Sequence, residues 1–172
     1  NTRLTAIEND GGSGGTSNTI NISNNTITNC LFNYAPATST TTNGMFGILN
    51  TASPSKLNIK NNTFSGSSTN SVVSNGQTSM IYNRGAVKDS LTVDGNIFTS
   101  LNLTAISNSV NNIKFIFNFP ATYNANCATT FTNNTLTGAG VTFGGGFVGT
   151  GSFAMLFNVD EGSSLLISGN SI

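Results

Sequence analysis

INISNNTI at residues 20–27 and LNIKNNTF at residues 57–64 are two copies of one eight-residue pattern. The pattern reads apolar, any residue, apolar, any residue, Asn or Gly, Asn, any residue, apolar. It recurs three more times, and successive copies begin 34 to 38 residues apart: LTVDGNIF at 91–98, TTFTNNTL at 129–136 and LLISGNSI at 165–172. Only Thr129, at the first position of the fourth copy, breaks the apolar rule. Self-similarity at this period is typical of a stacked repeat fold.

The positions within the pattern predict a strand, a bend and a second strand. The apolar first and third positions point to one face, as the two-residue period of a strand requires. The fifth position is Asn or Gly, the residues that best tolerate the left-handed backbone region, so the chain is expected to bend there. The sixth is Asn in every copy, and in stacked coils these amides would lie about 4.8 Å apart and bond to one another. The expected ladder comprises Asn25, Asn62, Asn96, Asn134 and Asn170.

A looser segment of five residues, closed by Asn, precedes each copy of the pattern. The segments are TAIEN, FGILN, SMIYN, TAISN and AMLFN, and they predict a second ladder of Asn9, Asn50, Asn83, Asn108 and Asn158. Residues 111–128 are then expected to be an insertion. Alternating Phe115, Phe117 and Phe119 in this insertion indicate an added strand that covers one side of the domain or docks on a partner.

These repeats predict an all-β fold, a right-handed parallel β-helix (β-solenoid) of about five long coils with Asn ladders. They resemble the right-handed parallel β-helix proteins of the pectin-lyase-like superfold. NISNNTI and FTNNTL are also similar to the short Asn-rich repeats of polymorphic outer-membrane adhesins. The resemblance implies a fold and says little of function, because this fold hosts lyases, tailspikes, adhesins and structural fibres. The rival fold, an antiparallel β-sandwich, gives no reason for Asn at fixed positions.

The composition limits the classes of function. Charged residues make up 7% of the chain, with six basic and six acidic side chains, and there is no His. His is the commonest general base and metal ligand, so we expect no enzyme, no cofactor and no metal site. Zero net charge without a basic cluster argues against nucleic-acid binding, and no apolar run reaches the roughly 20 residues of a membrane span. A hydrophobic fraction of 37% with 12 Phe suffices for one core, so residues 1–172 are predicted to form a single domain.

Candidate chemistry is sparse. A polysaccharide-cleaving relative would carry a cluster of acidic residues on one sheet face. The chain offers Asp94 on a predicted strand beside Lys60 of the neighbouring coil, with Asp89 before it and Asp160 and Glu161 in a turn. Solvated turn acids are the more ordinary interpretation of these residues. The GGGFVG stretch at 144–149 has the spacing of a phosphate-binding loop, but no helical pattern follows it.

Two kinds of covalent modification stay open. Five sequons, at Asn21, Asn24, Asn61, Asn102 and Asn133, would accept glycans in a eukaryotic secreted protein. The sequons at Asn24, Asn61 and Asn133 also have a structural explanation. In each, the sequence N-N-T consists of the Asn of the bend, the Asn of the ladder and an outward-facing Thr. Cys30 and Cys127 form a disulfide or remain two thiols. A bond within the chain would have to span about three coils, so a bond between subunits, or none, is an equal alternative.

The expected function is therefore that of a non-enzymatic, extracellular structural or adhesive β-solenoid. Its ends suggest a head-to-tail building block of a surface fibre, or a segment of a longer repeat array, because uncovered strand edges recruit other strands. The expected partners are copies of itself or cell-surface glycans of a host. The alternative is a carbohydrate-binding or polysaccharide-degrading β-helix.

Overall fold

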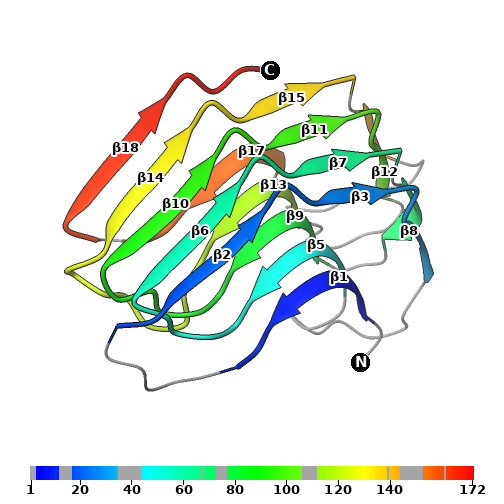
Figure 1. The fold of residues 1–172 in the computed structure, drawn as a ribbon. Helices are drawn as coiled ribbons and strands as arrows, with labels where there is room; N and C mark the ends of the chain where they lie inside the picture. The colour runs from blue at the N-terminus through cyan, green and yellow to red at the C-terminus, as the bar shows by residue number, and fades with distance from the viewer. Residues whose placement is uncertain are drawn as a thin grey trace.

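The computed structural model describes residues 3–11, 17–34, 44–66, 68–72, 77–105, 112–138, 140–143, 153–160 and 162–172. These segments form eighteen strands in four sheets (Figure 1). We name the sheets A (β1-β5-β9-β13-β17), B (β2-β6-β10-β14-β18), C (β3-β7-β11-β15) and D (β4-β8-β12-β16). No helix long and apolar enough to cross a membrane occurs in the described part of the chain.

The chain visits the sheets in a fixed order and returns one strand further along each time. The first two coils comprise β1 (Arg3–Asn9), β2 (Thr19–Ser23), β3 (Thr26–Thr28), β4 (Leu31–Tyr34), β5 (Gly44–Asn50), β6 (Lys56–Lys60), β7 (Thr63–Ser65) and β8 (Ser68–Val72). The next two comprise β9 (Gln77–Asn83), β10 (Ser90–Asp94), β11 (Ile97–Thr99), β12 (Asn102–Ala105), β13 (Asn112–Asn118), β14 (Ala128–Thr132), β15 (Thr135–Thr137) and β16 (Gly140–Phe143). The last coil supplies β17 (Phe153–Asn158), β18 (Ser164–Ser168) and a bridge from Ser171 to Thr135.

Every pairing between these strands is parallel, and equivalent positions of successive copies lie opposite one another. Leu57, for example, pairs with Ile20 on one side and with Leu91 on the other. The predicted parallel β-solenoid with stacked repeats is confirmed, and the antiparallel sandwich is excluded for the described strands.

Backbone bends separate sheet B from sheet C and sheet C from sheet D. The first bend lies at the predicted fifth position, where φ is positive in every copy: Asn24 (59°), Asn61 (54°), Gly95 (64°), Asn133 (55°) and Gly169 (65°). A second column of bends, which the sequence did not indicate, follows five residues later: Asn29 (54°), Gly66 (62°), Ser100 (52°) and Gly138 (60°). Each three-residue strand of sheet C is therefore held between two sharp corners.

The apolar positions of the pattern form the core between the sheets. Leu57, Ile59 and Phe64 of the second copy are completely buried, and Phe98 of the third copy stacks on Phe64 with 5.1 Å between ring centroids. Burial alternates along β6, β10 and β14, so outward side chains separate the buried ones. The first, third and eighth positions of the pattern thus act as predicted.

One prediction about the fourth coil is wrong. Residues 112–118 are not part of an insertion, because they form β13 between β9 and β17 of sheet A. The TAISN segment instead begins within β12 of sheet D, and Asn108 lies outside the described residues. The fourth coil contains two apolar segments that end in Asn, at 104–108 and 112–118, and only the second pairs with β9 and β17.

Candidate functional site

The predicted first ladder of Asn side chains runs the length of the solenoid. The Nδ2 of Asn62 donates to the Oδ1 of Asn96 over 3.0 Å and to the carbonyl of Ile22 over 2.9 Å. The Oδ1 of Asn62 accepts from the Nδ2 and the backbone N–H of Asn25. The same bonds link Asn96 to Asn134 and Asn134 to Asn170. The amides of the interior coils are fully buried, and each satisfies both its donor and its acceptor capacity.

A second ladder follows the end of sheet A. Nδ2 to Oδ1 bonds of 2.6 to 2.7 Å join Asn9, Asn50, Asn83, Asn118 and Asn158 in that order. Asn118 therefore holds the place predicted for Asn108. Asn50 and Asn83 also donate to the carbonyls of Ala52 and Gly85, which fixes the turn that follows each strand.

Both ladders have the same direction. In each bond between coils the amide nitrogen belongs to the earlier coil and the amide oxygen to the later one. At the first coil this leaves the oxygens of Asn9 and Asn25 without a preceding ladder residue among the described residues. At the last coil it leaves the nitrogens of Asn158 and Asn170 without a following one in the same part of the chain. One edge of the solenoid thus presents acceptors and the other presents donors.

The core-facing side chains of the last coil are exposed, whereas the side chains at the equivalent positions of the interior coils are buried. Leu165 and Ile167 of β18 are 52% and 53% exposed, whereas Leu91 and Val93, two strands earlier in the same columns, are 1% exposed. Phe153 of β17 is likewise exposed. These residues face the core by register, so within the described part of the chain the edge at β17 and β18 presents an apolar surface.

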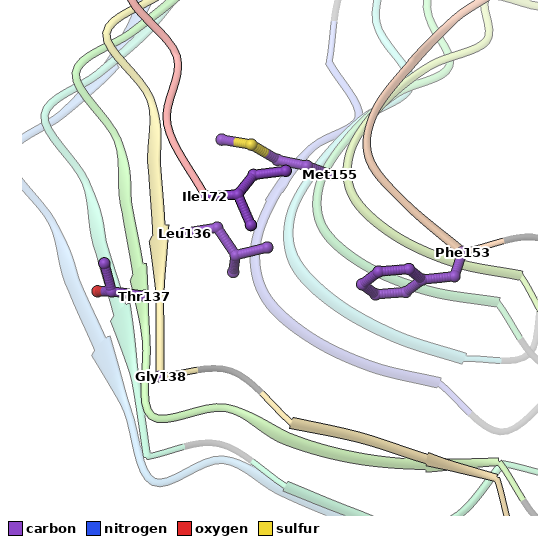
Figure 2. Close-up of a pocket in the computed structure, with 6 residues that line it drawn as sticks. All are labelled: Leu136, Thr137, Gly138, Phe153, Met155 and Ile172. Carbon is purple, nitrogen blue, oxygen red and sulfur yellow. The ribbon is translucent and has the colours of Figure 1, made fainter.

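A cavity of about 440 Å³ opens at this edge (Figure 2). It is lined by Leu136, Thr137, Gly138, Phe153, Met155 and Ile172. Figure 2 shows Leu136 and Ile172 on one side, with Phe153 and Met155 facing them from β17. The cavity lies beside the exposed apolar side chains of the last described coil, and its lining is mostly apolar.

The opposite edge, at β1 and β2, carries the matching residues. Leu4, Ile7 and Ile20 are partly buried and pack against the core from one side. Ile22 and Ile27 complete this edge. We call the two surfaces the donor edge (β17, β18 and residues 170–172) and the acceptor edge (β1, β2 and β3).

The acidic residues do not gather in the described structure. Asp94 lies on the outer face of sheet B opposite Lys60. The pKa of Asp94 is lowered, first of all by a hydrogen bond from Thr132. Burial, the next largest effect, raises this pKa, and a hydrogen bond from Asn133 and the charge of Lys60 lower it further. Asp89 precedes β10, Asp160 follows β17, and Glu161 lies outside the described residues. No group of three or more His, Cys, Asp or Glu that could hold a metal ion occurs among the residues described.

The residues considered for modification lie in different environments. The sequon residues Asn21, Asn24, Asn61, Asn102 and Asn133 are all exposed. Both cysteines are thiols, and Cys127 is buried whereas Cys30 is half-buried. Burial raises the pKa of the Cys127 thiol. Glycosylation stays a prediction.

A row of aromatic side chains on the outer face of sheet A was not predicted. Tyr82 stacks on Phe117 with 4.8 Å between centroids, and Phe46 lies 5.7 Å from Tyr82. The ammonium of Lys114 lies 4.3 Å from the ring centroid of Phe117 and 4.6 Å from that of Phe157, and burial lowers its pKa to about 8. The signal was present in the sequence, since FGILN, SMIYN and KFIFN carry apolar residues on both faces.

Comparison with protein families, with curated proteins and with solved structures found no match to this chain.

Proposed function

We propose that this protein is a non-enzymatic structural solenoid of the cell surface that stacks head to tail into a fibre. The observation that carries the proposal is that the donor edge and the acceptor edge bear complementary halves of the same columns. The proposed functional surfaces are therefore the donor edge and the acceptor edge, and not a pocket on the outer faces of the sheets.

The apolar columns continue across such a junction. If the register of the interior coils continued into a following copy, Leu4 of that copy would lie over Phe153, Ile20 over Leu165, and Ile22 over Ile167. Each contact would repeat one already present between interior coils. Because burial of apolar surface is the dominant favourable term in association, the exposed leucines and isoleucines of the donor edge would drive stacking.

The Asn ladders add direction to this contact. In a head-to-tail junction the nitrogens of Asn158 and Asn170 would meet the oxygens of Asn9 and Asn25 in a following copy. Two acceptor edges brought together would oppose oxygen to oxygen, and buried polar groups without partners are costly. A head-to-tail contact does not close on itself, so it generates a filament rather than a two-fold dimer.

The surface chemistry supports an extracellular place for such a fibre. Few charges and many hydroxyl and amide groups suit a flank that faces water, glycans or neighbouring copies. Adhesion to glycans on this flank is the secondary role that we propose. Carbohydrate binding or cleavage as the main activity is the alternative, and release of unsaturated sugars from a polysaccharide would favour it.

Two adjacent leucines of β18 provide a matched test. Leu165 and Leu166 are 52% and 53% exposed, but Leu165 faces the core column and Leu166 faces outward beside Thr130. The chain at increasing concentration is expected to form fibres in electron micrographs and to sediment as a growing species. Leu165→Lys should abolish both, because it places a charge in the junction, and Leu166→Lys should preserve them.

Two results would overturn the proposal. One is a wild-type chain that stays monomeric at high concentration. The other is native material whose intact mass shows that further coils of the same polypeptide cover the donor edge, because the coil would then be supplied within one molecule.

A further inference from the structure

The outer face of sheet C carries a two-dimensional array of hydroxyl groups. Each strand of this sheet has three residues, of which the middle one is buried and the other two point outward. Seven of the eight outward positions are Thr or Ser, and Ile97 holds the eighth. We call this surface the hydroxyl array: Thr26, Thr28, Thr63, Ser65, Thr99, Thr135 and Thr137.

The array is regular in two directions. Along the solenoid axis, parallel pairing places Thr28, Ser65, Thr99 and Thr137 in one column and Thr26, Thr63, Ile97 and Thr135 in the other. Neighbours within a column lie about 4.8 Å apart, and the two columns are separated by about 6.6 Å along each strand. Figure 1 shows the four strands running side by side.

The fold keeps this face rigid. The backbone turns through a positive-φ corner on either side of each strand, at Asn61 and Gly66 for β7 and at Gly95 and Ser100 for β11. The Asn ladder runs directly beside the first corner. The ladder bonds and the buried middle residues hold successive coils in register, so the spacing of the hydroxyls is set by the interior.

The chemistry of the array selects a periodic, hydrogen-bonding ligand. Each Thr offers a hydroxyl that can donate and accept, beside a methyl group that displaces loosely held water. No charged side chain lies among the eight outward positions, whereas the outer face of sheet B carries Lys56, Lys60 and Asp94. Sugar and nucleic-acid surfaces that bind by stacking need exposed aromatic rings, and the array has none.

We propose that the hydroxyl array binds the surface of an ice crystal and arrests its growth. Ice is a ligand made only of hydrogen-bonding groups that repeat every few ångströms in two directions, as the array does. A single hydroxyl holds water weakly, but a rigid array presents many at fixed spacings and loses little entropy when it engages a lattice. This inference goes beyond the proposed function and does not depend on fibre formation.

The test uses the purified 172-residue chain and a single ice crystal in a cooled microscope stage. The wild-type chain is expected to separate the freezing point from the melting point and to shape the crystal into facets. Thr99→Tyr, in β11 at the centre of the array, should remove most of this gap, because a ring projecting from the face prevents contact with a flat lattice.

Thr92→Tyr is the matched control. Thr92 lies in the same coil, on the outer face of sheet B between Asn58 and Thr130. This variant should keep the wild-type gap, and circular dichroism melts should confirm that both variants are folded. Round crystals with no gap for the wild-type chain would overturn the inference. So would equal loss in the two folded variants, or adsorption to a crystalline polysaccharide without any effect on ice.

Discussion

Replacement of Asn96 by Ala tests whether the amide ladder holds the coils together. Asn96 lies in the middle coil and is fully buried. Its Oδ1 accepts from the backbone N–H and the Nδ2 of Asn62, both over 3.0 Å, and its Nδ2 donates to Asn134 over 2.9 Å and to the carbonyl of Ile59 over 3.0 Å. The substitution therefore breaks four buried bonds at once.

The magnitude follows from the groups left behind. Two buried N–H groups of Asn62 lose their acceptor, and each buried donor without a partner costs about 1 to 3 kcal/mol. We expect Asn96→Ala to lower the free energy of unfolding by about 4 kcal/mol. Urea unfolding followed by circular dichroism and by tyrosine fluorescence measures the change, and coincident transitions would verify that a single free energy applies.

Asn58→Ala is the control for this experiment. Asn58 likewise bonds an Asn side chain of a neighbouring coil, since its Nδ2 donates to the Oδ1 of Asn21 over 2.8 Å, but this bond points to the preceding coil and lies on the exposed face of sheet B. Its loss should change the free energy of unfolding by about 0.5 kcal/mol or less, as is usual for surface positions. If the two variants differed by under about 1 kcal/mol, the claim that buried amides stabilise the stack would be refuted.

Two other perturbations have expected outcomes. Gly95→Ala should lower the free energy of unfolding by about 1 to 3 kcal/mol, since φ is 64° there and a Cβ would lie 2.5 Å from the Oδ1 of Asn61; an unchanged urea midpoint would contradict this. Burial lowers the pKa of Lys114 from 10.5 to about 8 in the folded chain. Between these pH values the unfolded chain therefore binds more protons than the folded one. The free energy of unfolding should then rise as the pH increases from 8 toward 10.5. Lys114→Met should flatten this rise in urea titrations at several pH values, and an equal slope in both proteins would show that Lys114 is not the titrating group.

The sequence predicted those parts of the fold that only one residue type can build. A ladder amide must offer both an acceptor and two donors at fixed geometry, and among side chains of that length only Asn does so. Asn62, Asn96 and Asn134 were therefore recognisable without a structure. The first bend was recognisable for a similar reason, since Asn and Gly tolerate positive φ better than other residues.

Features that several residue types can form were not predicted from the sequence. The second bend accepts Ser100 as well as Gly66, and the short strands of sheet D share no common pattern, so neither feature was recognisable from the sequence. In the fourth coil the rule of an apolar segment closed by Asn fitted both 104–108 and 112–118. The choice between them depends on which Asn reaches Asn83 and Asn158, and pairing between distant segments cannot be read from local sequence.

The donor edge could be foreseen only in outline. The apolar pattern is the same in both coils, so only the packed structure shows that Leu165 is exposed whereas its equivalent Leu91 is buried. The direction of the ladders needs the structure too, because the residue type Asn does not tell which coil donates. The polarity proposed for the fibre thus rests on hydrogen-bond geometry, for which the sequence offers no signal.

The regular core of this solenoid and the regular hydroxyl groups on the outer face of sheet C have the same structural origin. A strand repeats every two residues, so the backbone that buries Phe64 must turn Thr63 and Ser65 outward. Each coil that an Asn amide holds in register therefore also places two hydroxyl groups in register on sheet C. Stacking of further coils would lengthen both the ladder and the array with the same spacing. The proposed assembly would act at the ends and the proposed ice binding on sheet C, so substitution should remove each without the other, whereas loss of the ladder should remove the periodicity on which both depend.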